Sequence, residues 1–360
     1  MRGRTVALAA LAVLLAPMAG ADGVFLVDTG SPDAKMAMAS RPSSTEIEAA
    51  DDFVLSCPTS IERASFFGLL PADANVTQVV VEIYRVFPQD SDTSRTINVP
   101  TRANSPSDVA FLARDSGANE LTFSTTQITS LFTAANSVLN DITVNAGGEG
   151  PVTGAEVRFD VTFTSTISLP AGHYFFVPQV ALDSGNFFWL SAPHPVLSFS
   201  PDLQAWMRNE SLAPDWLRVG TDIVGGASPP TFNGAFSLSG TTTPFSVTAS
   251  AASPLSVPAE APIVPVTFTA SGGTPAYTFA EIGSIPGLSL DPSTGILSGT
   301  PTIPGTYPIS VNATDSLGCT GSTAFAIVVT VHPGIPTLGG SGVAVFVMVI
   351  AAAGVLALRR

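Results

Sequence analysis

Two stretches in the middle of the chain, 76–87 and 156–164, alternate between apolar and polar side chains with a period of two. This period predicts strands with one buried face, because successive side chains on a strand point to opposite sides. The predicted buried faces are formed by Val79, Val81 and Ile83 in the first stretch and by Val157, Phe159, Val161 and Phe163 in the second. The opposite faces carry Gln78, Glu82 and Tyr84 in the first and Arg158, Asp160, Thr162 and Thr164 in the second.

Shorter apolar segments between turn residues extend the same pattern. Further strands are predicted at 24–27, 173–177 and 187–190. The one stretch that favours a helical turn is 125–140. Many short strands joined by turns predict an all-β protein, with an antiparallel β-sandwich of jelly-roll type over 51–240. Residues 22–50 precede the sandwich as an N-terminal strand and loop.

Short motifs mark both ends of the 51–240 region. They are Asp51-Asp52-Phe53, Ile61 and Phe66-Phe67-Gly68 near its start, and Ala235-Phe236-Ser237-Leu238-Ser239-Gly240 at its end. These motifs resemble the opening and closing strands of jelly-roll ectodomains found in bacterial secreted proteins upstream of anchoring tails. The resemblance implies a fold and carries no agreed activity.

Residues 241–333 differ in composition, since charge nearly vanishes after a Thr-Thr-Thr-Pro linker at 241–244. The motifs of this region are Ser271-Gly272-Gly273-Thr274-Pro275-Ala276-Tyr277-Thr278-Phe279, Pro286-Gly287-Leu288-Ser289-Leu290 and Asp291-Pro292-Ser293-Thr294-Gly295. The last of them predicts a turn between two strands, with Gly295 free to take a positive φ. The motifs resemble the immunoglobulin-like (Ig-like) domains of bacterial surface proteins, which are related to cadherin-like modules. The resemblance implies a second sandwich of about seven short strands.

The chain has two cysteines, Cys57 and Cys319, one in each predicted domain. They fit neither a zinc site nor a CxxC redox pair. Ig-like copies of this kind often carry a Cys near their start, but 245–265 has none here. Cys319 is therefore either a lone thiol or the partner of Cys57.

The first 21 residues predict a secretory signal peptide. Arg2 and Arg4 precede an apolar core at 6–15, and Ala19 and Ala21 form the small-x-small cleavage pattern. Signal peptidase is the partner that this segment implies. The alternative is an uncleaved membrane anchor.

Residues 334–360 hold three parts in succession. A short motif, Ile335-Pro336-Thr337-Leu338, is followed by an apolar run that ends at Leu358 and by two basic residues, Arg359 and Arg360. From residue 340 to 358 a helix would span roughly 28 Å, close to the hydrocarbon core of a bilayer. We therefore predict a C-terminal transmembrane helix whose basic tail stays on the cytoplasmic side.

This tripartite order resembles the IPTL-type C-terminal sorting domain of Gram-negative bacteria, similar in plan to the PEP-type tails handled by exosortases. The resemblance implies membrane retention followed by cleavage by a membrane-embedded, exosortase-like sorting transpeptidase. The copy departs from the pattern at 339–342, Gly-Gly-Ser-Gly, where many relatives carry a more polar and aromatic link. The alternative is a permanent transmembrane anchor.

The formal net charge is −14. The terminal segments hold four of the 14 basic residues and no acidic one, so the remainder carries −18. Such a surface repels phosphate backbones and excludes nucleic acid as a partner. Loop-adjacent carboxylates could instead bind a structural Ca²⁺, although no EF-hand spacing is present. These candidates are Asp51, Asp52, Asp90, Asp92, Asp291 and Asp315.

The sequence offers no recognisable catalytic constellation. None of the three histidines has the spacing of a metal ligand, and the single lysine, Lys35, lies in a predicted loop. Adjacent Asp51 and Asp52 would point to opposite faces of a strand, which argues against a catalytic pair. We therefore expect a protein that is not an enzyme.

Three tryptophans raise the question of carbohydrate binding, because sugar rings stack on exposed aromatic faces. Most aromatic side chains in a sandwich belong to its core. Trp206 and Trp216 are the candidates for a ligand platform, since they flank a polar stretch at 208–211 that is predicted to be a loop.

These features favour a non-enzymatic, exported protein of the outer surface or envelope of a Gram-negative bacterium. It would bind polysaccharide or matrix, or serve as a structural element. The alternative is a secreted hydrolase that acts on glycans through an unrecognised site in the N-terminal sandwich.

Overall fold

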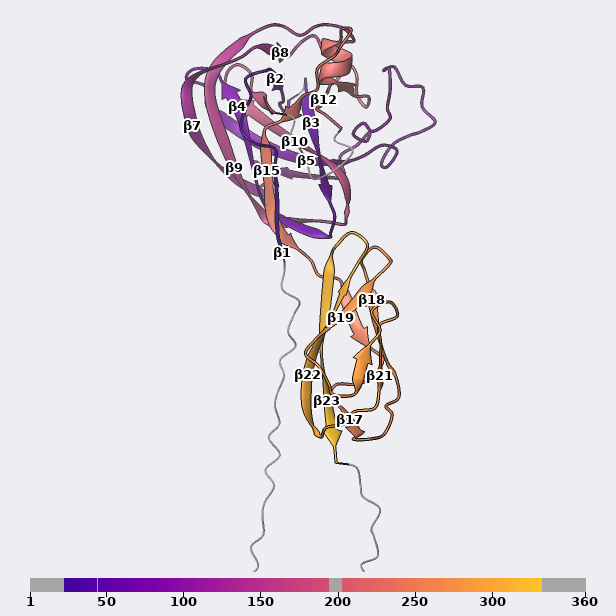
Figure 1. Ribbon diagram of the computed structural model, residues 1–360. Coiled ribbons are helices and arrows are strands. Elements are labelled where there is room, and N and C mark those ends of the chain that lie inside the picture. The colour runs from indigo at the N-terminus through magenta and orange to yellow at the C-terminus, as the bar shows by residue number, and fades with distance from the viewer. Residues whose placement is uncertain (1–22, 44, 194–202, 332–360) are drawn as a thin grey trace, which may run out of the picture. The chain divides into compact units, whose positions relative to one another are not determined.

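The computed structural model describes residues 23–43, 45–193 and 203–331 (Figure 1). In this part of the chain nearly every regular element is a strand, which confirms the prediction of an all-β protein built from sandwiches. The predicted signal peptide with Ala19 and Ala21 and the predicted tail at 334–360 lie outside the described residues. Among the residues that are described, no helix is long and apolar enough to cross a membrane.

The chain forms two compact units. The described part of the first unit runs to Pro244 and includes the separate segment Leu317–Cys319, and the second begins at Phe245. The structure shows no break at residue 50, because one strand, β3 (Ile47–Leu55), crosses it. The stretch predicted as N-terminal strand and loop therefore belongs to the first sandwich.

One sheet of the first unit has nine strands within the described residues. Its strands are β1 (Gly23–Asp28), β2 (Met36–Ala39), β4 (Thr59–Leu70), β7 (Leu121–Ala134), β8 (Asn136–Val138), β9 (Val152–Leu169), β11 (Phe188–Ala192), β14 (Asn233–Gly234) and β15 (Phe236–Thr242). The main order is β1-β15-β4-β11-β2-β8, with β9 beside β4, β7 beside β9 and β14 beside β11.

The second sheet of this unit has six strands in the described chain, in the order β13-β12-β3-β10-β5-β6. Besides β3 these are β5 (Val76–Arg85), β6 (Leu112–Asp115), β10 (Gly172–Leu182), β12 (Trp206–Asn209) and β13 (Leu217–Arg218). A short π-helix, η1 (Val219–Val224), follows β13.

The two sheets enclose one apolar core. The predicted inward faces of β5 and β9 are buried in it, as the period of two required. Aromatic rings from both sheets meet at its centre, where Phe176 of the six-stranded sheet stacks on Phe236 of the other at 5.0 Å. Gly234 has to be glycine, because a Cβ there would lie about 2 Å from the indole of Trp189.

The prediction of a helical turn in 125–140 is wrong. Residues 121–134 form β7, which pairs with β9, and 136–138 form β8, which pairs with β2. Thr and other β-branched residues are frequent in this stretch and fit a pleated surface better than a helix. Pairing with β9 supplies the backbone hydrogen bonds that a helix would otherwise make.

The second unit contains two four-stranded sheets within its described residues, ordered β16-β18-β21-β20 and β17-β23-β22-β19. Their strands are β16 (Ser246–Ala249), β17 (Leu255–Pro258), β18 (Val266–Ser271), β19 (Thr278–Ile282), β20 (Leu288–Leu290), β21 (Ile296–Gly299), β22 (Gly305–Thr314) and β23 (Thr320–Thr330). The predicted turn at 291–295 is confirmed. Asp291 Oδ1 accepts hydrogen bonds from the N–H groups of Ser293 (2.8 Å) and Thr294 (3.0 Å), and Gly295 has φ 67°.

Cys57 and Cys319 form a disulfide with a Cα–Cα distance of 5.5 Å. Cys57 follows β3, and Cys319 lies between β22 and β23 in the sequence. The sequence left open whether Cys319 is a lone thiol or the partner of Cys57, and the structure shows that the two are paired. Cys319 is therefore no lone thiol.

Candidate functional site

The outer face of the six-stranded sheet, which points away from the main core, carries polar side chains. Alternation along β3, β5 and β10 places one set of residues in the main core and the other set on this outer face. A second apolar cluster covers part of it, formed by Ala50, Tyr84, Phe175, Val177, Leu203, Trp206 and Trp216. Ionisable groups lie beside this cluster and are buried with it.

Arg208 and Glu48 form the centre of these polar groups. They face each other across the antiparallel pair of β12 and β3, and both are more than nine-tenths buried. Arg208 Nη2 donates to Glu48 Oε1 (3.0 Å) and to the Tyr84 hydroxyl (2.8 Å), and Arg208 Nε also contacts Glu48. The guanidinium lies 4.3 Å from the centroid of the Trp216 ring. This stacking and pairing offset the cost of burying the charge.

Tyr84 connects Glu48 with a second carboxylate, Glu82. Its hydroxyl lies 2.7 Å from Glu48 Oε1 and 3.1 Å from Glu82 Oε2. One hydroxyl has one proton and can donate to only one of the two carboxylates. The second contact becomes a hydrogen bond when Glu82 is protonated and donates to the phenol oxygen.

Burial, followed by the negative charge of Glu48, raises the pKa of Glu82 to about 7. Burial is also the largest cause that raises the pKa of Glu46 near the same site. Both shifts keep a proton at the site in the folded state at pH values where an exposed glutamate would be ionised.

The stability of the first unit should therefore depend on pH. The folded-state pKa of Glu82 lies above its ordinary value of 4.5, so the stabilisation is complete below pH 4.5 and is lost as the pH rises through about 7. We expect the free energy of unfolding to fall by about 2 kcal/mol between pH 5 and pH 8. Urea titrations followed by tryptophan fluorescence measure it, because all three tryptophans lie in this unit.

Glu82→Gln should flatten this dependence, since glutamine keeps the shape and cannot titrate. Glu62→Gln removes one exposed carboxylate elsewhere on the same unit and serves as the matched control. If the free energy of unfolding falls equally steeply with pH in wild type and in Glu82→Gln, Glu82 is excluded as the source of the pH dependence.

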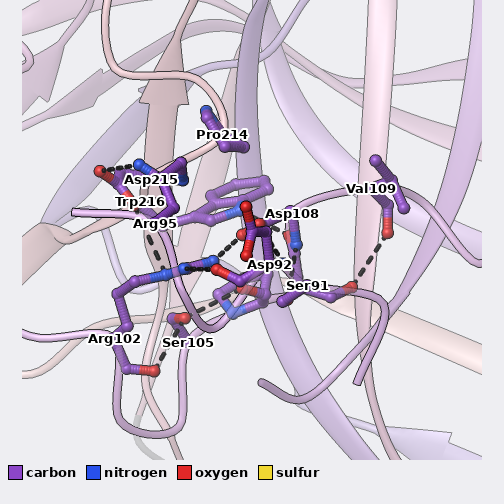
Figure 2. Close-up of polar contacts among 12 residues, drawn as sticks. Ser91, Asp92, Arg95, Arg102, Ser105, Asp108, Val109, Pro214, Asp215 and Trp216 are labelled. Carbon is purple, nitrogen blue, oxygen red and sulfur yellow. Dashed lines mark hydrogen bonds and ion pairs between the residues drawn. The ribbon is translucent and has the colours of Figure 1, made fainter. Parts of the chain in front are cut away.

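A second polar network fixes the long connection between β5 and β6 onto this outer face (Figure 2). The carboxylate of Asp108 pairs with Arg102 and accepts the backbone N–H of Asp92 (2.9 Å). The fully buried carboxylate of Asp215 pairs with Arg95 and lies 3.5 Å from Arg102 Nε. Although burial raises the pKa of Asp215, hydrogen bonds from Arg95 and the Asn98 N–H hold it below its ordinary value.

The two networks are joined. Arg208 Nη1 donates to the carbonyl of Asp108 (3.0 Å), and Trp216 Nε1 donates to the carbonyl of Ser107 (3.1 Å). The connection between β5 and β6 is therefore held at its backbone as well as through its charged side chains. The connection therefore lies against the Arg208 guanidinium.

Two adjoining hollows lie beside the Glu48–Arg208 pair, with volumes of about 300 and 260 Å³. They share three residues, Glu46, Asn209 and Glu210. Arg41, Thr45 and Asn140 add polar groups to the first, and Glu48 and Arg208 lie at the second. Carboxylate, amide, hydroxyl and guanidinium groups thus offer both donors and acceptors to a ligand. None of the described lining residues is aromatic.

The predicted aromatic platform is wrong. Trp206 and Trp216 are each 1% exposed and belong to the second apolar cluster. Their indole N–H groups donate to the carbonyls of Leu203 and Ser107, both at 3.1 Å. Leu203 belongs to the same cluster, and Val86 and Ala110 of the connection after β5 pack against it.

Asp51 and Asp52 point to opposite sides of β3, as predicted. Asp51 Oδ2 accepts the N–H of Gly234 (2.9 Å). Asp52 Oδ1 accepts the N–H of Leu203 (2.9 Å), and its Oδ2 lies 2.5 Å from His173 Nε2. The two carboxylates therefore hold separate backbone segments and do not act as a pair.

The other Ca²⁺ candidates also contact protein donors. Asp90 pairs with Arg85, Asp92 accepts from Ser94, and Asp315 accepts the N–H of Thr274 (2.8 Å). In the described part of the chain, no three His, Cys, Asp or Glu side chains stand together as a metal site would require.

The residues of the hollow were not identified from the sequence. Glu46 and Glu48 precede the Ala-Ala-Asp-Asp run without a motif, and Arg208 is separated from Glu48 by 160 positions. The available signal is a charge inside an apolar strand, as in Trp206-Met207-Arg208-Asn209. Such a charge has to find a partner when it is buried.

A model of the family described as "Putative Ig domain" matches residues 229–330, so the chain contains an Ig-like domain there. No curated protein matches the chain.

Among solved structures, the chain is similar to a putative alpha-galactosidase from Bacteroides fragilis, with 23% identity over 24% of this chain and 18% of that chain, at a TM-score of 0.21. It is also similar to a putative alpha-galactosidase/melibiase from the same organism, with 26% identity over 23% of this chain and 17% of that chain, at a TM-score of 0.19. The chain thus spans less than a fifth of either protein.

Proposed function

We propose that this chain is an exported surface protein that binds a neutral polysaccharide through the hollow beside Glu48 and Arg208. The Ig-like domain supports an extracellular setting. The Cys57–Cys319 disulfide also supports it, because such bonds persist in oxidising compartments. In this proposal the first sandwich is of the jelly-roll class. The Ile335–Leu338 motif then sorts the protein to the cell surface.

The polar residues that line the hollow are the observation that supports a sugar as the ligand. Sugars present closely spaced hydroxyls that both donate and accept hydrogen bonds, and Glu46, Asn140, Asn209 and Glu210 offer matching groups. The carboxylates near the hollow outnumber the guanidinium groups. A neutral ligand is therefore favoured over an acidic one.

Glycan hydrolysis is the second candidate, and one observation favours it. Glu82 has a pKa of about 7, which suits a general acid near neutral pH. Two observations argue against this role. Glu48, its nearest carboxylate, is engaged by Arg208 and Tyr84, and Glu82 does not line either hollow. Binding without turnover is therefore the function that we propose.

Binding and hydrolysis can be tested together on a panel of neutral and acidic polysaccharides with the purified full chain. We expect binding to a neutral member and no released sugar. Glu210→Ala should weaken this binding by about fivefold, since the exposed Glu210 lines both hollows and one lost hydrogen-bonding group costs about 1 kcal/mol.

Glu62→Ala is the matched control, because it removes an exposed carboxylate of β4 that lines neither hollow. Equal affinities of wild type and Glu210→Ala would place the ligand elsewhere. Released sugar that disappears in Glu82→Gln would favour hydrolysis, and a panel without any binding would contradict the proposal.

A further inference from the structure

β7 forms an edge of the nine-stranded sheet. Among the described strands it pairs only with β9, and Figure 1 shows the two as long curved strands at one side of the first unit. The pairing is regular from Leu121 to Gln127, and register shifts follow at 127/129 and 129/132. The regular part therefore presents seven residues of backbone on its far side.

The regular part of this edge lacks the charged residues and proline that commonly prevent pairing with another strand. Exposed edges in proteins commonly carry charged residues or proline, which oppose the addition of a further strand. No charged residue and no proline occurs between Glu120 and Asp141. The chain as a whole carries −14, so most of its surface repels a second copy and this edge does not.

The side chains of the regular part are complementary to those of an antiparallel copy of the same segment. Thr122, Ser124 and Thr126 are exposed on one face of β7. An antiparallel copy centred on Ser124 would place Thr122 opposite Thr126 on both sides of the centre. Cross-strand Thr–Thr pairs stabilise sheets, and no like charges meet in this register.

We propose that a second copy of this chain pairs with β7 through an antiparallel, two-fold interface centred on Ser124. The two sheets then join into one continuous sheet. Ile128 and Leu131, which are 51% and 73% exposed, lie beyond the paired stretch. Self-association would present two polysaccharide-binding hollows in one particle, but the pairing itself does not depend on that function.

Sedimentation velocity of the purified full chain tests the pairing. We expect a concentration-dependent dimer. Ser124→Lys should raise its dissociation constant at least tenfold, because the substitution places two ammonium groups opposite each other at the centre. Ser168→Lys adds the same charge to an exposed position of β9 away from the edge and should leave the dimer unchanged.

Cross-linking tests the register. Ser124→Cys should form a covalent dimer under mild oxidation, since each residue faces its own copy, whereas Thr122→Cys should not. The native cysteines are joined to each other and do not interfere. A wild type that stays monomeric at about 100 µM, or a Ser124→Lys variant that dimerises as wild type does, would overturn the proposal.

Discussion

Replacing Arg208 with methionine should lower the free energy of unfolding of the first unit by about 3–5 kcal/mol. Methionine has a similar length and can fill the space beside Trp216, so the loss comes from the charge and its hydrogen bonds. Glu48 would remain buried without its cation, and burying an unpaired carboxylate is costly. The carbonyl of Asp108 would also lose its donor.

Urea unfolding followed by tryptophan fluorescence measures this loss. Arg63→Met, at an exposed position of β4, is the control for removing a guanidinium from the same unit. The double variant Glu48→Gln/Arg208→Met should lose less than the two single losses added together, because neither residue then leaves a buried charge behind. A loss below about 1 kcal/mol for Arg208→Met would show that the pair is not buried as described.

Removing the disulfide is expected to have the second large effect. The bond joins residues 262 positions apart, and closing so long a loop restricts the unfolded chain strongly. We expect Cys57→Ser/Cys319→Ser to lower the free energy of unfolding by about 2–5 kcal/mol. Urea titrations of the double variant and of wild type measure the difference.

Wild type treated with a reductant should reproduce the loss of the double variant, and the reductant should not change the double variant further. Thiol labelling of the untreated, unfolded wild type should find no free cysteine. Superimposable unfolding curves for wild type and the double variant would contradict a stabilising role of the bond.

Local patterns predicted the parts of the fold that depend on neighbouring residues. The buried faces of β5 and β9 follow from the period of two, and the turn at Asp291 follows from the ability of an aspartate to accept nearby backbone N–H groups. In 125–140 the pattern was weaker, and pairing with β9 decided the outcome. Local preference is a weak guide where a neighbouring strand is available.

The candidate site could not be predicted in this way, because its partners are distant in the sequence. Arg95 and Asp215 are 120 positions apart, and Glu48 and Arg208 are 160 apart. The sequence left open whether Trp206 and Trp216 belong to the core or to a ligand platform, because the polar stretch between them suggested a loop. Whether they are covered depends on connections elsewhere in the chain, and these bury both indoles.

Mass spectrometry of the mature protein from its native cells is the most direct test of the central claim, that this is an exported and sorted surface protein. The account predicts a first residue of Asp22, a C-terminus at or shortly after the Ile335–Leu338 motif, and Cys57 linked to Cys319. A chain that still begins at Met1, retains Arg360 and carries reduced cysteines would contradict it.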